Sequence, residues 1–199
     1  MYTIMRRNAS SCLPTVALEE KERRWELRAH TNLHYSENME IRLDHRYTVF
    51  MPATIFLASK ADQEFAQPIV DTLNEFGVQH ETVMASAHKA PEKVIKHITM
   101  LNEKEWPMVV IAVVGMSNGL GGMLAANCLH PVITCPVLSD ITQYQVHIHS
   151  SLQMPKDVPL MTVLHPVNAA LAAVRILAVS DPALKEKVAK RMRAVKATY

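Results

Sequence analysis

Residues 108–114 read MVVIAVV, and residues 115–122, which follow directly, read GMSNGLGG. The first stretch is the most apolar run in the chain and shows no alternation of polar and apolar residues, which is typical of a central parallel strand buried on both faces. The second stretch holds four of the chain's five glycines. A buried strand that leads into a glycine-rich loop predicts an α/β protein that binds its ligand beyond the end of the strand.

Short apolar runs and helical patterns alternate on both sides of this strand. Further strands are predicted at 53–58, 78–84, 132–135 and 160–164, and helices between 62 and 77 and at 91–103, 121–129 and 168–179. This alternation favours a doubly wound sheet of five parallel strands. A last helix begins at Asp181-Pro182, and its single apolar face could pack on a partner subunit: Leu184, Val188, Met192 and Val195.

The composition argues against several classes of protein. Lys and Arg number 21 against 19 Asp and Glu, so the net charge of +2 gives no basic field for nucleic acid. No apolar run is long enough to predict a membrane span. Cys12, Cys128 and Cys135 form no paired framework, which favours free thiols in a reducing compartment, the cytoplasm. Neither the cysteines nor His130, His147 and His149 have the closely spaced paired ligands of a zinc site, so no metal is expected.

Residues 1–50 differ from the rest of the chain. They carry 8 basic and 7 acidic residues, no glycine and only isolated apolar positions. We expect a poorly ordered N-terminal extension, with a transit peptide as the alternative and one charged helix at 18–28. The predicted domains are therefore the extension at 1–50, the α/β domain at 51–180 and the terminal helix at 181–199.

Three loops that follow predicted strands carry the candidate chemistry. The first, residues 59–62 (SKAD), offers a hydroxyl, a lysine and helix N-terminal amides that can hold a phosphate, although Ser59 and Asp62 would serve equally as turn and cap residues. The second, residues 86–89 (SAHK), places His88 beside Lys89, where an imidazole suits acid–base work unless it is an ordinary surface histidine. The third is the glycine-rich loop, whose glycines suggest a ligand close to the backbone.

Five segments together resemble one known family. They are SAHKAPEKV at 86–94, VVGMSNGLGGMLAAN at 113–127, PVITCPVLSD at 131–140, SSLQMPKDVP at 150–159 and NAALAAVRILA at 168–178. In this order they resemble the phosphoribosylaminoimidazole carboxylases, the PurE family, over roughly residues 53–180. The resemblance implies a flavodoxin-like three-layer sandwich, a homo-octamer, and a lyase of purine biosynthesis that needs no metal or organic cofactor.

The resemblance also implies a reaction and a set of site residues. His88-Lys89 and Ser117-Asn118 resemble the class II enzymes, which carboxylate aminoimidazole ribonucleotide directly with CO2, and imply His88 as the acid–base. The same resemblance assigns the ribose and phosphate to Ser59, Asp62, Ser86 and Lys89, and the imidazole and CO2 end to Ser117, Asn118 and Gly119.

Two loops depart from the family pattern. The first loop of the family usually reads Gly-Ser-x-Ser-Asp, whereas this chain has Ala58 and Ala61 in place of the glycine and the second serine. The third loop has Met116 where class II members usually have arginine. These departures keep three alternatives open: a non-catalytic nucleotide-binding homologue, the class I mutase of N5-carboxyaminoimidazole ribonucleotide, and a carboxylase of another heterocycle.

Overall fold

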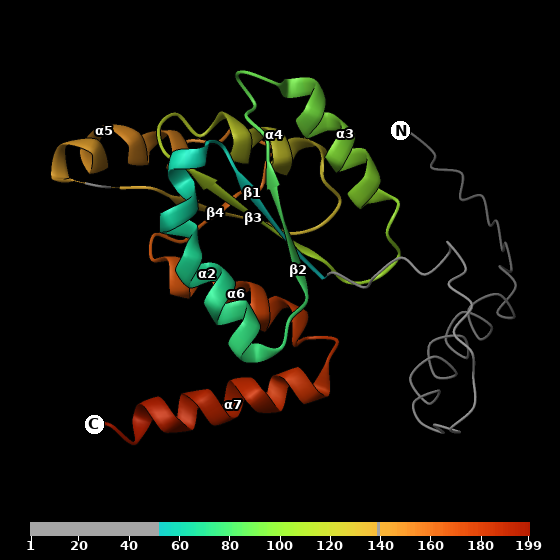
Figure 1. The fold of residues 1–199 in the computed structure, drawn as a ribbon, viewed down its shortest axis with the longest axis vertical. Coiled ribbons are helices and arrows are strands. Elements are labelled where there is room, and N and C mark those ends of the chain that lie inside the picture. Colours follow the sequence, from blue (N-terminus) through green and yellow to red (C-terminus); the bar gives the residue numbers. More distant parts are fainter. Residues whose placement is uncertain (1–51, 139) are drawn as a thin grey trace, which may run out of the picture. The chain divides into compact units, whose positions relative to one another are not determined.

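The computed structural model describes residues 52–138 and 140–199, which form an α/β domain (Figure 1). The extension at 1–50 and the charged helix predicted within it lie outside the described residues. The five strands are β1 (Ala53–Leu57), β2 (His80–Met84), β3 (Val109–Val114), β4 (Val132–Pro136) and β5 (Met161–Thr162). The helices are the short 3-10 helix η1 (Lys60–Asp62), α2 (Gln63–Phe76), α3 (Pro91–Asn102), α4 (Gly119–Asn127), α5 (Ile141–Leu152), α6 (Pro166–Leu177) and α7 (Pro182–Lys196).

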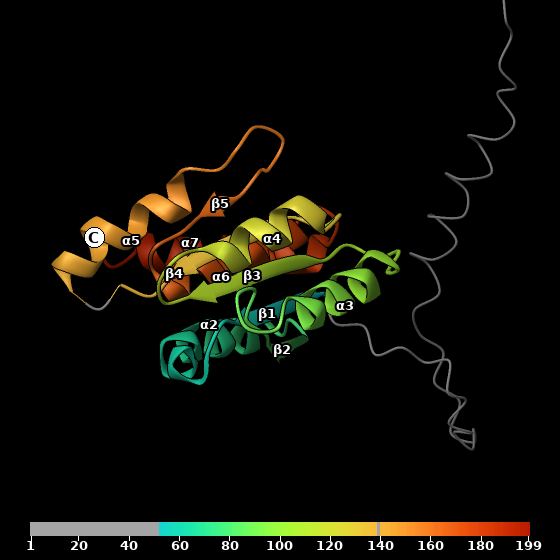
Figure 2. The same ribbon diagram turned by 90° about the horizontal axis from the view of Figure 1, so that it is seen from above.

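All five strands are parallel and lie in the order β2-β1-β3-β4-β5 (Figure 2). This order is that of flavodoxin-like doubly wound sheets, in which the chain reverses its direction of travel across the sheet between β1 and β3. Helices α2 and α6 cover one face of the sheet, with α7 packed beside them, and α3 and α4 cover the other. The predicted fold class, a three-layer sandwich around a five-stranded parallel sheet, is confirmed.

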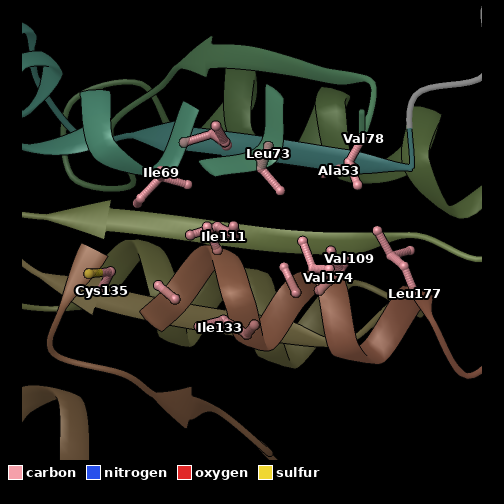
Figure 3. Close-up of a cluster of buried hydrophobic side chains, with 14 of the residues drawn as sticks. Ala53, Ile69, Leu73, Val78, Val109, Ile111, Ile133, Cys135, Val174 and Leu177 are labelled. Carbon is pink, nitrogen blue, oxygen red and sulfur yellow. The ribbon is translucent and has the colours of Figure 1, made fainter. Parts of the chain in front are cut away.

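The central strand is as buried as its sequence predicts. Every residue of β3 is buried, because its alternate side chains contribute to two separate apolar layers. Val109 and Ile111 pack with Ile69 and Leu73 of α2 and with Val174 of α6 (Figure 3). The alternate residues of β3 pack against α3 and α4. The site at the end of β3 is therefore built on a strand held from both sides.

The predicted elements differ from the structure by one or two residues at most ends, and the prediction lacks one helix. The second strand begins at His80 rather than residue 78, because the backbone leaves α2 through Gly77 in the left-handed region, with φ of 72°. The fifth strand is only Met161–Thr162. Helix α5 was not predicted, since its sequence ITQYQVHIHSSL mixes β-branched and polar residues without a helical apolar stripe.

The terminal helix α7 packs on its own chain. Leu184 is buried in the core, Lys187 Nζ donates a hydrogen bond to the Phe76 carbonyl at the end of α2, and Arg191 pairs with Glu75. Met192 and Val195, on the same apolar face, remain 43% and 49% exposed. Among the described helices, none has the length and apolar character needed to cross a membrane.

Candidate functional site

The three candidate loops begin side by side because their strands are neighbours in the sheet. The ladder continues just past the strand ends, since the Ala58 amide donates to the Val113 carbonyl (3.1 Å) and the Ala85 amide to the Leu57 carbonyl (3.0 Å). The carboxyl ends of β1, β2 and β3 therefore form one rim. In doubly wound folds this rim, next to the switch in strand order, is where ligands bind.

The first loop is a capping box closed by one buried carboxylate. The Ser59 amide donates to Asp62 Oδ2 (2.8 Å), and the Ala61 amide donates to Ser59 Oγ (3.1 Å). Asp62 is 4% exposed, and burial raises its pKa from the ordinary value of 3.8, while the hydrogen bonds from Ser59 oppose that rise. Lys60 is exposed beside this carboxylate. Ser59 and Asp62 thus form the helix cap that the sequence suggested. The Ser59 amide is already hydrogen-bonded to Asp62.

The second loop presents His88 at the surface. The Ala90 amide donates to the Ser86 carbonyl (2.9 Å), which closes a tight turn before α3, and His88 and Lys89 are exposed. One face of the imidazole lies against Gly119 of the third loop. A Cβ built on Gly119 would stand 2.7 Å from His88 Cε1 and 2.8 Å from His88 Nε2. Only glycine permits this approach, so a contact between two loops, and not a turn, explains this glycine.

The third loop is organised by Asn118, which is 3% exposed and caps α4. Its Oδ1 accepts from the Gly121 amide (3.0 Å), and its Nδ2 donates to Thr134 Oγ1 and to Ser151 Oγ (both 3.0 Å). The Asn118 amide donates to Ser150 Oγ (3.1 Å). The amide side chain is therefore directed into the protein, whereas the neighbouring Ser117 is exposed.

The third loop also touches the first. A Cβ on Gly115 would stand 3.0 Å from Asp62 Oδ1, so this carboxylate oxygen lies directly against the backbone at the end of β3. The third loop is thus contacted at two points, by Asp62 at Gly115 and by His88 at Gly119. Ser59 adjoins Asp62 through its hydrogen bond, and Ser86, Lys89 and Ser117 stand in the second and third loops.

The sequence did not single out Thr134, Ser150 or Ser151. The serines belong to α5, the helix that was not predicted, and Thr134 lies inside the apolar strand β4. A threonine in the middle of a buried strand is itself a signal, because a buried hydroxyl needs a hydrogen-bond partner.

The cysteines and the possible metal ligands are weaker candidates for a functional site. Cys128 and Cys135 are free thiols, and burial raises the pKa of both, that of Cys135 to about 12, so neither is poised as a nucleophile. Cys12 lies outside the described residues. Within the described part of the chain, no group of three or more His, Cys, Asp or Glu side chains is placed to hold a metal ion.

A groove of about 440 Å³ lies between α6 and α7, away from the rim. Its walls are mainly apolar, with cationic groups among them, and are formed by Phe76, Val167, Asn168, Leu171, Arg175, Val188, Arg191, Met192, Val195 and Lys196. It contains no carboxylate, histidine, thiol or hydroxyl that could act in a reaction. The rim is therefore the better candidate for a catalytic site.

Comparison with known proteins identifies the family of this chain. Residues 53–198 match the family model described as AIR carboxylase. A phosphoribosylaminoimidazole carboxylase of Archaeoglobus fulgidus is 40% identical over 138 residues, which are 69% of this chain and 75% of that protein. An N5-carboxyaminoimidazole ribonucleotide mutase of Aquifex aeolicus is 36% identical over 136 residues, 67% of this chain and 81% of the relative.

A solved structure shares the fold of this chain. The crystal structure of Treponema denticola PurE superposes with a TM-score of 0.71 at 31% sequence identity, covering 73% of this chain and 92% of that one. The family match spans the whole described domain, from the first strand into the terminal helix, and includes all three loops of the rim. The chain belongs to the AIR carboxylase, or PurE, family.

Proposed function

We propose that this protein is an enzyme of purine biosynthesis that carboxylates 5-aminoimidazole ribonucleotide with CO2 to give 4-carboxy-5-aminoimidazole ribonucleotide. The observation that carries the proposal is the position of His88, whose imidazole lies against Gly119 at the junction of the second and third loops. At that junction an imidazole that can accept a proton lies beside glycine backbone, which has no side chain to block a substrate.

The reaction needs one proton transfer at the carbon that reacts. The C4 carbon of the aminoimidazole is enamine-like, so it attacks the carbon of CO2 and forms the new carbon–carbon bond. The ring then loses its C4 proton to the His88 imidazole, and aromaticity is restored. In the reverse direction the imidazolium returns the proton to C4 and CO2 leaves. No redox step occurs, and atoms and charge balance without a further co-reactant.

The remaining site residues have roles that fit their positions. Lys89 and Lys60 are exposed cations beside the rim, suited to the substrate phosphate. Ser59, Asp62 and Ser86 stand in the first and second loops, at the proposed ribose and phosphate end. Ser117 and Gly119 stand at the proposed imidazole and CO2 end. Asn118 belongs to that end through its backbone and through the loop that it shapes, since its side chain is bonded inside the protein.

The competing reaction is the mutase, which moves a carboxyl group from the exocyclic N5 amine to the ring carbon C4 of the same nucleotide. Relatives carry both names, at 40% and 36% identity, so the overall likeness does not separate them. The His88-Lys89 and Ser117-Asn118 pairs resemble class II and favour direct carboxylation. A non-catalytic homologue is the second alternative, favoured by Ala58, Ala61 and Met116, the last of which is 71% exposed at the rim where a cation is usual.

The test is turnover of 4-carboxy-5-aminoimidazole ribonucleotide to its decarboxylated form, with bicarbonate-dependent carboxylation and conversion of the N5-carboxylated substrate measured beside it. We expect turnover in the carboxylase assay and its loss in His88→Asn. His80→Asn is the matched control, because His80 begins β2 at the opposite end of the sheet from the rim. Conversion of the N5-carboxylated substrate alone would assign the mutase, and ligand binding without any turnover would assign a binding homologue.

The oligomer is a second part of the proposal. The exposed face of α7 with Met192 and Val195 borders the apolar groove beside α6, and we expect it to be covered in a homo-octamer. Light scattering after gel filtration measures the mass. Met192→Glu with Val195→Glu is expected to give smaller species, and an unchanged mass would exclude this face from the interface.

A further inference from the structure

Half of the buried polar residues described for this protein gather beside the rim. Six buried residues carry polar or charged side chains, namely Thr54, Asp62, Thr72, Asn118, Thr134 and Ser151. Asn118 donates to both Thr134 and Ser151, and the three residues come from three separate elements, the N-terminus of α4, strand β4 and helix α5. We call these three residues the buried triad. Their burial needs a reason, because each buried polar group must keep its hydrogen bonds or lose stability.

The hydrogen bonds of the triad fix the orientation of the Asn118 amide. Both hydrogens of Nδ2 are used, one on Thr134 Oγ1 and one on Ser151 Oγ, while Oδ1 accepts from the Gly121 amide. The flipped amide would turn its NH2 group toward the Gly121 N–H, which is a donor facing a donor. The two hydroxyls therefore select the rotation of the amide, and through it the cap of α4.

The backbone next to the triad carries the contact with His88. Gly119 follows Asn118 directly, and a Cβ on Gly119 would stand 2.7–2.8 Å from two atoms of the imidazole. Helix α5 holds this backbone a second time, since Ser150 Oγ accepts from the Asn118 amide and itself donates to the His147 carbonyl. A shift of the Asn118–Gly119 segment must therefore change the surface on which the imidazole lies.

We propose that Thr134 and Ser151 are positioning residues: through Asn118 they hold Gly119 against His88 and so fix the imidazole that the proposed function uses as its acid–base. Neither hydroxyl faces the rim, since Thr134 is fully buried and Ser151 is 2% exposed. They act on turnover only through the third loop. The effect on turnover rests on the proposed function, whereas the effect on the placement of His88 does not.

The test uses variants that remove one hydroxyl at a time from the full chain. Ser151→Ala and Thr134→Val delete one partner of Asn118, and Thr134→Ser keeps the hydroxyl and serves as the rescue. Thr72→Val is the matched control, because Thr72 is also buried and donates to a carbonyl, that of Pro68 in α2. The Thr72→Val variant shows how the loss of a buried hydroxyl far from Asn118 affects the two readouts through the stability of the fold alone.

Two readouts are measured on each variant. The first is the split between kcat and KM for the carboxylase reaction, in which we expect kcat to fall about 10- to 100-fold with little change in KM, because the reacting group is displaced while the phosphate loops stay. The second is the rate at which diethyl pyrocarbonate modifies His88, followed by peptide mass spectrometry, with His80 and His97 as internal references. We expect this rate to rise about fivefold or more, because a loosened loop uncovers Nε2.

The outcomes separate the two proposals. Thr134→Ser should behave as the wild type in both readouts, and Thr72→Val should leave both unchanged. If Ser151→Ala and Thr134→Val match Thr72→Val in kcat and in the modification rate of His88, the positioning role is wrong while the carboxylase stands. If the wild type shows no turnover but the modification rate rises in both variants, the proposed reaction is wrong while the positioning role stands.

Discussion

The first and third loops of the rim each contain one buried polar side chain, and they use it in opposite ways. In the first loop, Asp62 is a carboxylate bonded to Ser59 of its own loop, and among the described residues no other element donates a hydrogen bond to it. In the third loop, Asn118 is neutral and is bonded to β4, to α5 and to the Gly121 amide. One side chain closes a local turn, and the other joins three elements.

The two side chains differ in the hydrogen-bonding capacity that they have left. A carboxylate has about four acceptor positions, so Asp62 has acceptor positions left beyond its bond from Ser59, as the proposed contact with the ribose requires. Asn118 has both of its donors and its oxygen engaged in the protein. We therefore expect Asn118 and Gly119 to act on a ligand through the backbone and substitutions of them to act by geometry, whereas substitutions in the first loop act by charge and hydrogen bonding.

The largest effect is expected from Gly119→Ala. Its Cβ would overlap the His88 ring at 2.7–2.8 Å, so the imidazole or the loop must move. We expect turnover to fall about 100-fold or more. Gly122→Ala is the matched control in the same helix, because its Cβ would make an ordinary contact of 3.5 Å with the Met154 sulfur. Equal activity of the two variants would show that the contact between Gly119 and His88 does not matter.

Gly121→Ala tests the third loop through stability. A Cβ on Gly121 would overlap Asn118 Oδ1, so the amide must leave its position and release its partners. We expect the free energy of unfolding, measured in urea, to fall by about 3 kcal/mol, since several buried hydrogen bonds break together. A loss no greater than that of Gly122→Ala would mean that the cap of α4 adapts without cost.

Ala61→Ser tests the first loop by adding chemistry to it. The hydroxyl restores the second serine of the pattern that the family resemblance gives for this loop, at an exposed position beside Lys60. We expect KM for the nucleotide to fall about threefold, the low end for one added hydrogen bond, with kcat unchanged. Ala183→Ser, on the exposed start of α7, is the control. A change in kcat instead of KM would place this residue with the reacting end of the substrate.

The smallest effect is the pH dependence that Asp62 contributes to stability. Burial raises its pKa above 3.8, so the folded protein holds this proton more tightly than the unfolded chain does. The contribution of Asp62 to the free energy of unfolding therefore falls as pH rises from the unfolded pKa through the raised one, and is constant above it. Asp62→Asn does not titrate, so the stability of the wild type relative to this variant should decline over that range.

Urea unfolding of both proteins between pH 3.5 and pH 7 measures this difference. A relative stability that grows with pH would contradict the prediction, since it would mean that the hydrogen bonds from Ser59 outweigh the cost of burying the carboxylate. Asn118 does not titrate. The pH dependence of stability therefore again distinguishes the first loop, which has a carboxylate, from the third, which has a neutral amide.

The sheet and the position of the site could be predicted from the sequence because they depend on local signals. MVVIAVV fixes a strand buried on both faces through apolar side chains alone, and four glycines directly after it mark where backbone approaches another group. His88 and Lys89 could be singled out for a similar reason, since they follow a predicted strand. The roles of the individual residues came from the family resemblance.

Only the tertiary structure decided what each polar group of the rim touches. The sequence holds Asn118, Thr134 and Ser151 at separations of 16 and 33 residues, and nothing local pairs an asparagine with a threonine in a strand and a serine in a helix that its own pattern does not predict. The same is true of Gly119 and His88. Apolar burial is non-directional, so the composition and the periodic pattern of apolar residues are enough to predict it. A hydrogen bond needs two groups within about 3 Å of each other, and residues distant in sequence come that close only after the chain has folded.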